Sequence, residues 1–293
     1  MYLLSLLLSD PGSGSVFWAV AFSAAAPLRM LQPDEAILPN FVSRLSHFAA
    51  RSIPLRLHKI RNRQPVVSFT FDDFPASAHE EGAAILESFG ARASFFTSTA
   101  LLGKPHPLWK MAGPEAIADL ADRGHEIGLH THGHMPLWQT NARTLTSDIE
   151  RNLNRLQNLS PELSIESFAY PYGVLTPRGK WTLSGMTRAN RSAHPGLNNG
   201  WMDLDFVRAY ELSDARISLT QVTKIMDTAV ATGGWAVFFA HEISRSSGLF
   251  KTSPDLLAAT IKAALERDIH IRLFTSALDH VGVPHRSVLL PSR

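Results

Sequence analysis

Two adjacent carboxylates, Asp72 and Asp73, follow an apolar run within the stretch S-F-T-F-D-D-F-P. The residues from Val66 to Phe71 are mostly apolar, β-branched or aromatic, which is typical of a strand buried on both faces of a parallel sheet. Adjacent side chains of an extended segment point to opposite sides. One carboxylate could therefore bind a cation while the other, turned toward a bound water, acts as a base. The alternative is a strand-terminating turn with an Asp as helix N-cap.

The second group of candidate metal-binding or catalytic residues is the histidine-rich sequence G-L-H-T-H-G-H. His130 and His134 are four residues apart, so a helical turn would place both imidazoles on one side. Two imidazoles and a carboxylate suit a divalent ion such as Zn²⁺ and leave a position open for water. Thr131 stands where a zincin motif needs Glu, which excludes that motif. His132 is interpreted as a loop residue, and a metal-free loop is the alternative for the whole group.

Composition limits the kinds of site that this chain can build. Of 293 residues, 45% are hydrophobic and 18% are charged, which fits a globular protein with a substantial core. The absence of cysteine excludes disulfides and thiolate metal sites, so any metal must be held by His, Asp or Glu. The net charge of +2 gives no argument for a polyanionic partner, and no nucleic acid is expected.

The elements that must position these residues alternate between strand and helix from Pro65 onward. Strands are predicted at Val66–Phe71, Ala93–Thr97, Glu126–His130, Ser167–Ala169, Phe206–Leu212, Trp235–His241 and Ile269–Phe274. Helices are predicted at Ala78–Phe89, Pro114–Asp122, Thr140–Leu159, Thr176–Ala189, Leu219–Ala231 and Pro254–Glu266. About seven strands interleaved with helices predict an α/β fold with a parallel sheet, closed into a (β/α) barrel.

The barrel prediction brings four strand ends to one mouth, because active sites of such barrels lie at the C-terminal ends of the strands. These ends carry the two aspartates, the histidine loop, the sequence Y-P-Y-G with Tyr170 and Tyr172, and the sequence F-F-A-H-E with His241.

In this order, S-F-T-F-D-D, G-H-E-I-G-L-H-T-H-G-H, F-A-Y-P-Y-G and F-F-A-H resemble the motifs of the polysaccharide deacetylase (NodB-homology) family. The similarity extends roughly from Pro65 to Thr275. It implies a distorted seven-stranded (β/α) barrel that removes acetyl groups from N-acetylated, or sometimes O-acetylated, sugars with one divalent metal ion. Zn²⁺ is the expected ion, and Co²⁺ or another divalent ion is the alternative.

Matched by motif position, the resemblance implies that Asp73, His130 and His134 are the metal ligands. Asp72 would be the catalytic base and His241 the general acid, while the backbone N–H of Tyr172 would help to hold the oxyanion. These residue types suit amide hydrolysis, which needs an activated water, oxyanion stabilisation and a proton for the leaving amine.

Two departures from the family pattern concern the groups around the base. Many members carry Arg two residues before the Pro of the third motif, where this chain has Ala169. Arg188, Arg191 or Arg208 could replace it, and the sequence does not distinguish them. The fourth motif, an Asp with a nearby Trp, has no firm match in W-M-D-L-D.

Aromatic side chains near the predicted mouth could stack on the apolar faces of sugar rings. Trp138, Tyr170 and Tyr172 are the main candidates, and Trp181 and Trp201 are weaker ones. For each of these tryptophans, core packing is the alternative.

Residues 1–64 are predicted to form an N-terminal extension, and residues 65–293 the barrel domain. Val16–Ala26 resembles the apolar core of a secretion signal, but no Lys or Arg precedes Arg29, and a start at Met30 is the alternative. The segment is too short for a stable membrane span. The compartment stays open, with a cytoplasmic location slightly favoured. Six Lys or Arg and no acid lie between Phe41 and Arg63, which predicts a solvated basic face.

The sequence therefore predicts a hydrolase of carbon–nitrogen bonds other than peptide bonds, which deacetylates a carbohydrate such as a chitooligosaccharide. Three alternatives remain: an O-acetyl esterase or other amidohydrolase on the same scaffold, a catalytically silent carbohydrate-binding barrel, and a nucleic-acid binder through residues 41–63.

Overall fold

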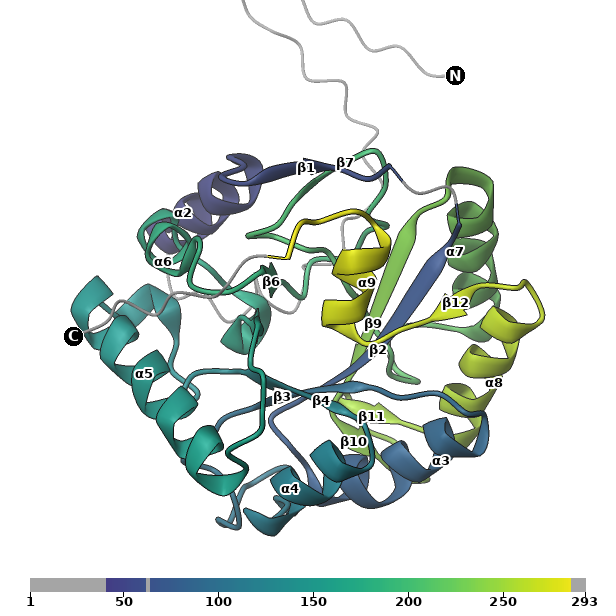
Figure 1. The fold of residues 1–293 in the computed structure, drawn as a ribbon, viewed down its shortest axis with the longest axis horizontal. Coiled ribbons are helices and arrows are strands. Elements are labelled where there is room, and N and C mark those ends of the chain that lie inside the picture. Colours follow the sequence, from purple (N-terminus) through teal and green to yellow (C-terminus); the bar gives the residue numbers. More distant parts are fainter. Residues whose placement is uncertain (1–40, 62–63, 286–293) are drawn as a thin grey trace, which may run out of the picture. The chain divides into compact units, whose positions relative to one another are not determined.

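The computed structural model describes residues 41–61 and 64–285, which lie in one compact unit (Figure 1). The predictions for Val16–Ala26 and Met30 fall outside the described residues. Among the described residues, no helix combines the length and the apolar composition that crossing a bilayer requires.

A curled parallel sheet forms the centre of the fold and confirms the predicted α/β class. Its strand order is β6-β5-β4-β3-β2-β9-β8, with β12 also paired to β2. These strands are β2 (Val66–Asp72), β3 (Ser94–Thr97), β4 (Glu126–Leu129), β5 (Ser167–Ala169), β6 (Ala189–Arg191), β8 (Tyr210–Glu211), β9 (Trp235–Ala240) and β12 (His270–Ile271). Each of these pairings is parallel, so all C-terminal ends point the same way.

Strand β2 is buried at every position because both of its faces and both of its edges are covered. One edge pairs with β9 along Val66–Phe71. The other edge pairs with β12 at Val66 and Val67 and with β3 from Thr70 onward. The predicted final strand is shorter than expected, because a helix begins at Phe274.

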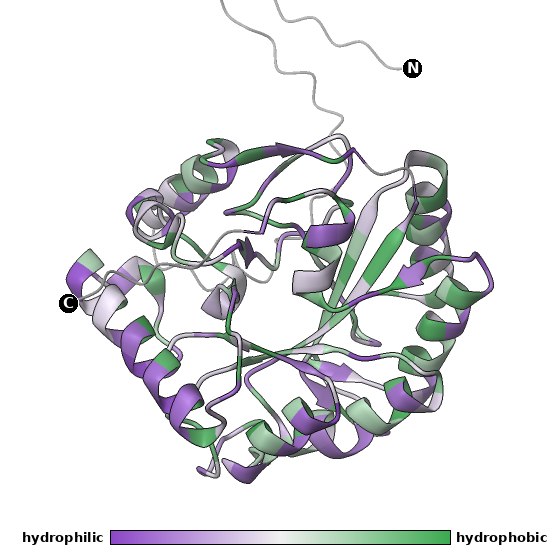
Figure 2. Ribbon diagram, in the orientation of Figure 1, coloured by the Kyte–Doolittle hydropathy of each residue, from purple (hydrophilic) through white to green (hydrophobic). Residues whose placement is uncertain are grey.

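Successive side chains of each strand point to opposite faces of the sheet, which divides the hydrophobic core into two clusters. In β9, Ala236 and Phe238 belong to the cluster beneath the outer helices, while Val237 and Phe239 belong to a second cluster inside the barrel. Both sets are apolar, which explains the continuous hydrophobic run in the sequence. Figure 2 shows green, hydrophobic segments in the strands at the centre of the fold and purple, hydrophilic segments along the outer helices.

Helices cover the outside of the sheet, as predicted. They are α2 (Phe41–Ser52), α3 (Ala83–Ser88), α4 (Glu115–Asp122), α5 (Ala142–Leu159), α6 (Pro177–Leu183), α7 (Leu219–Thr232) and α8 (Pro254–Leu265). Helix α9 (Phe274–His280) instead packs inside the barrel, where its Phe274, Ala277 and Leu278 belong to the inner cluster. Shorter turns are η1 (Ala78–Gly82), η2 (Leu137–Gln139) and η3 (Pro171–Gly173). In α5, which is predicted at Thr140–Leu159, Leu145, Ile149 and Leu156 form a buried stripe. The helix begins where the Asn141 side chain accepts a hydrogen bond from Thr144 N–H.

The predicted helix over Thr176–Ala189 is wrong beyond Leu183. Gly185 has φ +82°, a left-handed conformation that does not continue a right-handed helix. The chain then enters strand β6, whose Ala189–Arg191 pairs with Ser167–Ala169 of β5. On the edge of β6 that faces away from β5, Asn190 N–H donates to the carbonyl oxygen of Leu204 at 2.7 Å. This hydrogen bond partly closes the curled sheet.

The described part of the N-terminal extension packs on the barrel. Strand β1 (Leu57–Lys59) pairs antiparallel with β7 (Trp201–Asp203), and α2 contacts α6. The guanidinium of Arg56 binds Asp205 at 2.6 Å. A further small pair, β10 (Glu242–Ile243) with β11 (Lys251–Thr252), follows the C-terminal end of β9.

Candidate metal and catalytic site

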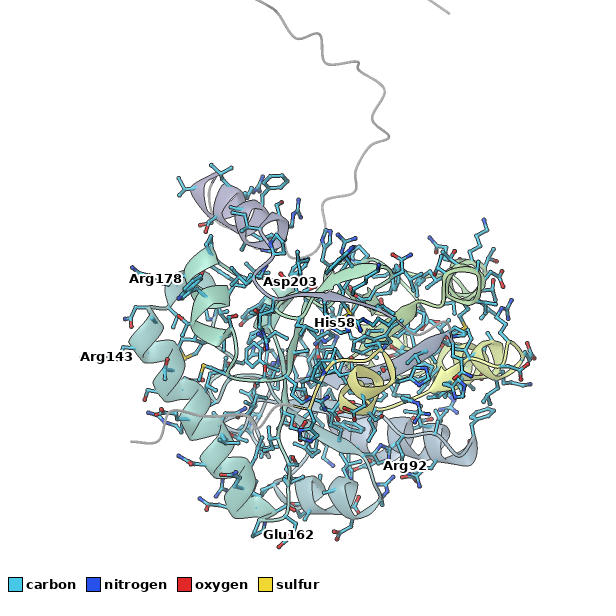
Figure 3. All side chains as sticks on the ribbon, turned by 45° about the horizontal axis from the view of Figure 1, so that its top comes forward. His58, Arg92, Arg143, Glu162, Arg178 and Asp203 are labelled. Atoms are coloured by element: carbon cyan, nitrogen blue, oxygen red, sulfur yellow. The ribbon has the colours of Figure 1, made fainter. Side chains whose placement is uncertain are left out.

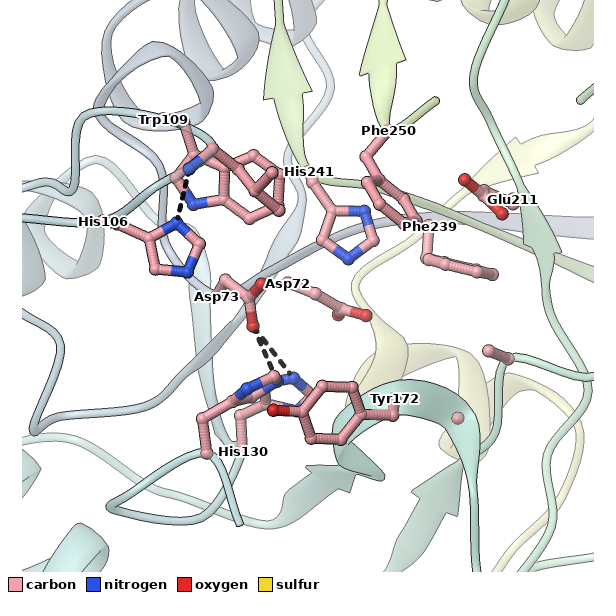
Figure 4. A pocket seen from close by; sticks show the side chains of 14 residues that line it. Asp72, Asp73, His106, Trp109, His130, Tyr172, Glu211, Phe239, His241 and Phe250 are labelled. Atoms are coloured by element: carbon pink, nitrogen blue, oxygen red, sulfur yellow. Dashed lines mark hydrogen bonds and ion pairs between the residues drawn. The ribbon is translucent and has the colours of Figure 1, made fainter. Parts of the chain in front are cut away.

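A cavity of about 300 Å³ opens at the C-terminal ends of β2, β4, β8 and β9 (Figure 4). Its lining residues are Asp72, Asp73, His106, Leu108, Trp109, His130, His134, Tyr172, Gly173, Ala193, Glu211, Phe239, His241 and Phe250. The predicted strand ends therefore meet at one place.

Three of the lining side chains converge on one point. Nε2 of His134 lies 3.0 Å and Nε2 of His130 lies 3.4 Å from Oδ1 of Asp73. In a tetrahedral zinc site with bonds of about 2.0–2.1 Å, neighbouring ligand atoms lie about 3.3 Å apart. The three atoms thus have the spacing of ligands around a single divalent ion, and Asp73 and His130 are buried.

The second nitrogen of His130 determines which atom faces Asp73. Nδ1 lies 2.9 Å from the carbonyl oxygen of Ala169, and because a carbonyl only accepts, Nδ1 carries the proton. In the neutral ring, Nε2 then presents a lone pair toward Asp73. Such a backbone contact is the usual support of a metal-binding histidine.

Asp73 lies in a strongly positive environment. Burial alone would raise the pKa of its carboxyl, but the charge of His134 and the close contacts with His130 and His134 hold that pKa well below the usual value. Oδ1 is buried, and no donor among the residues that the structure describes reaches it with good hydrogen-bond geometry. A divalent ion held between Asp73, His130 and His134 would give this oxygen a partner.

Left-handed backbone conformations orient these side chains. The φ angles of Asp73, Thr131, His134 and Tyr172 are +65°, +59°, +50° and +60°. Such values are uncommon for residues other than glycine and concentrate at functional sites. They correct two expectations: Asp73 does not continue the extended strand of Asp72, and the histidine loop makes no helical turn.

Asp72 is held by an arginine from strand β6, which is separated from β2 by three strands in the sheet order. Nη2 of Arg191 lies 2.5 Å from both carboxylate oxygens of Asp72, and both residues are buried. Its guanidinium lies between the rings of Phe96 and Phe239, at 5.2 and 4.9 Å from their centroids. Ala169 and Arg191 are register partners across β5 and β6, so this arginine lies one strand away from the position at which the family pattern places its arginine.

The other two candidate arginines lie elsewhere. Arg188 binds Glu166 at 3.1 Å and Asp279 at 2.5 Å. The side chain of Arg208 packs beside Gly196. The structure therefore selects Arg191 among the three alternatives.

His241 enters the cavity from the end of β9 and is surrounded by aromatic rings. It stacks on Trp109 with a centroid distance of 5.4 Å, and Phe239 and Phe250 meet it edge to face. Burial lowers its pKa, an effect that Asp73 and Asp72 partly oppose. Nδ1 is buried without a hydrogen-bond partner among the described residues.

The predicted aromatic platforms differ in their position. Tyr172 lines the cavity, packs on His134 at 4.5 Å and stays 44% exposed. Trp138 contacts Tyr172 at 5.5 Å instead of lining the cavity. Tyr170 does not fit the expectation, because it is buried and its hydroxyl donates to the carbonyl of Asp205. His132 turns away from the metal cluster, and its Nδ1 lies 2.7 Å from Thr99 Oγ1.

Several lining residues were not anticipated from the sequence. Trp109 and His106 come from an irregular loop, and Phe250 precedes the short strand β11, so no periodic pattern marked them. Glu211 ends strand β8. Burial raises the pKa of its carboxyl to about 7, and Arg216, 3.8 Å away, only partly opposes the shift.

Comparison with known proteins gives a consistent picture. The family model described as polysaccharide deacetylase matches residues 59–185, a range that contains the proposed metal cluster but ends before Arg191, Glu211 and His241. No curated protein matches the sequence.

Three solved structures share the fold. The family 4 esterase domain of a multidomain xylanase, from the hindgut metagenome of Trinervitermes trinervoides, is 17% identical with a TM-score of 0.53, over 75% of this chain and 93% of that chain. PdaA of Bacillus subtilis, a family 4 carbohydrate esterase, is 13% identical with a TM-score of 0.51, over 76% and 84%. A pseudoenzyme of that esterase family from Bacillus anthracis is 13% identical with a TM-score of 0.53, over 78% and 69%.

Proposed function

The chain belongs to the polysaccharide deacetylase family through residues 59–185, and from this premise we propose that it is a metal-dependent carbohydrate N-deacetylase. The proposed substrate is a chitooligosaccharide or another glycan that contains N-acetylglucosamine. The observation that carries the proposal is the convergence of a histidine–carboxylate cluster, an arginine-bound aspartate and a buried histidine on one cavity.

Asp73, His130 and His134 would hold one divalent ion, with Zn²⁺ as the first candidate and Co²⁺ as the second. When bound, such an ion polarises a carbonyl and lowers the pKa of a coordinated water. Asp73 brings the negative charge and the imidazoles bring neutral nitrogen ligands, a donor set that suits zinc.

Asp72 would accept the proton of the attacking water. Arg191 keeps its carboxylate in place through two contacts of 2.5 Å, and further lone pairs of the two oxygens can still accept the water proton. Because Arg191 is packed between two phenylalanine rings, it cannot move aside without losing those contacts. The base is thus held before substrate binds.

His241 would donate a proton to the nitrogen of the sugar as the carbon–nitrogen bond breaks, so that acetate and an amine leave. The aromatic rings around it exclude water from this transfer. The backbone N–H of Tyr172 would donate to the oxyanion, and the partly exposed tyrosine ring offers a face for a sugar.

Two observations support alternative functions for this chain. The similarity to the esterase domain of a xylanase supports O-deacetylation of xylan as the second candidate. The similarity to a pseudoenzyme supports a silent carbohydrate-binding barrel, although Arg191 argues against it by keeping Asp72 in a defined position.

The test is acetate release by the purified chain from N-acetylglucosamine oligomers and, in parallel, from acetylated xylan. Release from the oligomers that stops with chelator and returns with Zn²⁺ or Co²⁺ would support the proposal. Release from xylan alone would replace it with the esterase. Binding of the oligomers without release under either metal would favour the silent barrel.

A further inference from the structure

Helix α2 leaves a row of large apolar side chains exposed to solvent. His47 and Ala50 are buried against the barrel, whereas Val42, Leu45 and Phe48 are 72%, 55% and 52% exposed. Helices on the surface of a globular protein usually show the opposite arrangement. The exposed stripe follows the helical repeat, so it is a continuous strip along the helix.

Specific polar contacts hold the helix in this orientation. The ammonium group of Lys180, itself buried, donates to the carbonyl oxygens of Ala50 at 2.8 Å and Ile53 at 2.6 Å, at the end of α2. Nδ1 of His47 lies 3.3 Å from the backbone oxygen of Leu175. These contacts hold the side of α2 that carries His47 and Ala50 against the barrel, so Val42, Leu45 and Phe48 lie on the outer side.

The apolar surface extends to the neighbouring elements. Trp181 of α6 is 73% exposed and Trp201 of β7 is 64% exposed, and Leu57 of β1 is exposed beside them. Figure 1 shows α2 next to α6 and to the β1–β7 pair, and in Figure 3 side chains project outward from the purple helix α2. We call this surface the α2 face: Val42, Leu45, Phe48, Leu57, Trp181 and Trp201, with the cations described next.

The α2 face carries only positive charge. The segments 41–61, 177–183 and 195–202 contain no Asp or Glu. Their exposed cations are Arg44, Lys59, Arg61 and Arg178. Two further cations of these segments form ion pairs inside the fold. Arg56 binds Asp205, and Lys180 binds Asp203.

We propose that the α2 face binds the surface of an anionic lipid bilayer, with α2 lying in the plane of the interface. Exposed Trp, Phe and Leu beside Arg and Lys form the pattern of helices that insert an apolar side between lipid headgroups. The lack of acids matches the negative potential of such a membrane. A second copy of the chain would place like charges opposite each other, and nucleic acid would leave the apolar strip unused.

The test uses the full chain in sedimentation with vesicles of phosphatidylcholine, with and without 30% phosphatidylglycerol. Binding to the anionic vesicles is expected to be about tenfold tighter or more than to the neutral ones. The double variants Leu45→Ser/Phe48→Ser and Arg44→Glu/Arg178→Glu are each expected to weaken it by a similar factor. The matched control is Val230→Ser/Leu265→Ser, which changes equally exposed apolar residues on α7 and α8 and should bind normally.

Several results would overturn the proposal. Absence of vesicle binding would do so, and so would binding that neither double variant weakens, because residues 1–40 would then be responsible. Displacement by inorganic phosphate alone would indicate a site for free anions. A concentration-dependent dimer in sedimentation velocity that Leu45→Ser/Phe48→Ser dissociates would assign the face to a second copy. Tight binding of a DNA oligonucleotide without vesicle binding would assign it to nucleic acid.

Discussion

The cavity buries charged groups, and the α2 face exposes apolar groups. Both depart from the rule that folded proteins usually bury apolar side chains and expose charged ones. The cavity keeps charged groups inside: Asp72 binds Arg191, and Asp73 lies against two imidazoles. The α2 face keeps apolar groups outside, and 52–72% of each side chain on its helical stripe is exposed. Buried charge is costly unless paired, whereas exposed apolar surface costs the folded state little relative to the unfolded chain. Substitutions in the cavity should therefore change catalysis and stability strongly, and substitutions on the α2 face should change only association.

The largest effect is expected for Asp72→Asn. Loss of a general base typically lowers the rate by about 10²–10⁴-fold. Acetate release from N-acetylglucosamine oligomers should fall by that factor, while metal content, measured by atomic emission, stays at the wild-type level. Asp73→Asn is the control, because it should lower metal content as well. Unchanged turnover in Asp72→Asn would remove this carboxylate from the mechanism.

Arg191→Met should lower the free energy of unfolding by about 3–5 kcal/mol, because it leaves the Asp72 carboxylate buried without a partner. Urea denaturation at neutral pH measures this cost. In the double variant Asp72→Asn/Arg191→Met the cost should be much smaller, because no charge is left unpaired. Equal costs in both backgrounds would mean that Arg191 acts through packing against Phe96 and Phe239 instead of through its charge.

Glu211→Gln should change the pH dependence of stability. Burial raises the pKa of Glu211 from 4.5 to about 7, so the folded state binds this proton more tightly than the unfolded state. The resulting stabilisation is complete below pH 4.5 and is lost as the pH rises through 7. The variant lacks this loss, and relative to wild type it should gain about 3 kcal/mol between pH 4.5 and pH 8. Unfolding at both pH values measures the difference, with exposed Glu162→Gln as control.

The smallest effect is expected for Phe48→Ser, which should change the free energy of unfolding by no more than about 0.5 kcal/mol. Its only described ring contact is the guanidinium of Arg51 at 5.2 Å. Phe71→Ala, a truncation in the buried strand β2, should cost about 3–5 kcal/mol in the same thermal or urea unfolding experiment. A large loss of stability in Phe48→Ser would show that the α2 face is part of the folded core and would erase the contrast between the two regions.

Local sequence patterns were sufficient to predict the sheet and most of its helices. The apolar run over Val66–Phe71 is strand β2, the amphipathic stripe of Thr140–Leu159 is α5, and the parallel order follows from the alternation of strands and helices. The same patterns placed Asp72, Asp73 and the histidine loop at strand ends, and parallel strands of one sheet bring such ends together. Hydrophobic periodicity and the alternation of strands and helices depend on residues that are close in the chain, so they can be predicted from the sequence.

The tertiary structure alone decided which groups meet. Arg191 binds Asp72 because β6 pairs with β5 in a register that sets it beside Ala169, whereas the sequence pattern predicted a helix up to Ala189 and no strand at Ala189–Arg191. The left-handed conformations of Asp73 and His134 depend on the packing that surrounds them. The outward apolar side of α2 depends on Lys180, about 130 residues away, whose ammonium must reach the last carbonyls of that helix. The register of two strands, the contact of a long side chain with a distant helix and a strained backbone conformation all depend on residues far apart in the chain. No local sequence pattern encodes them.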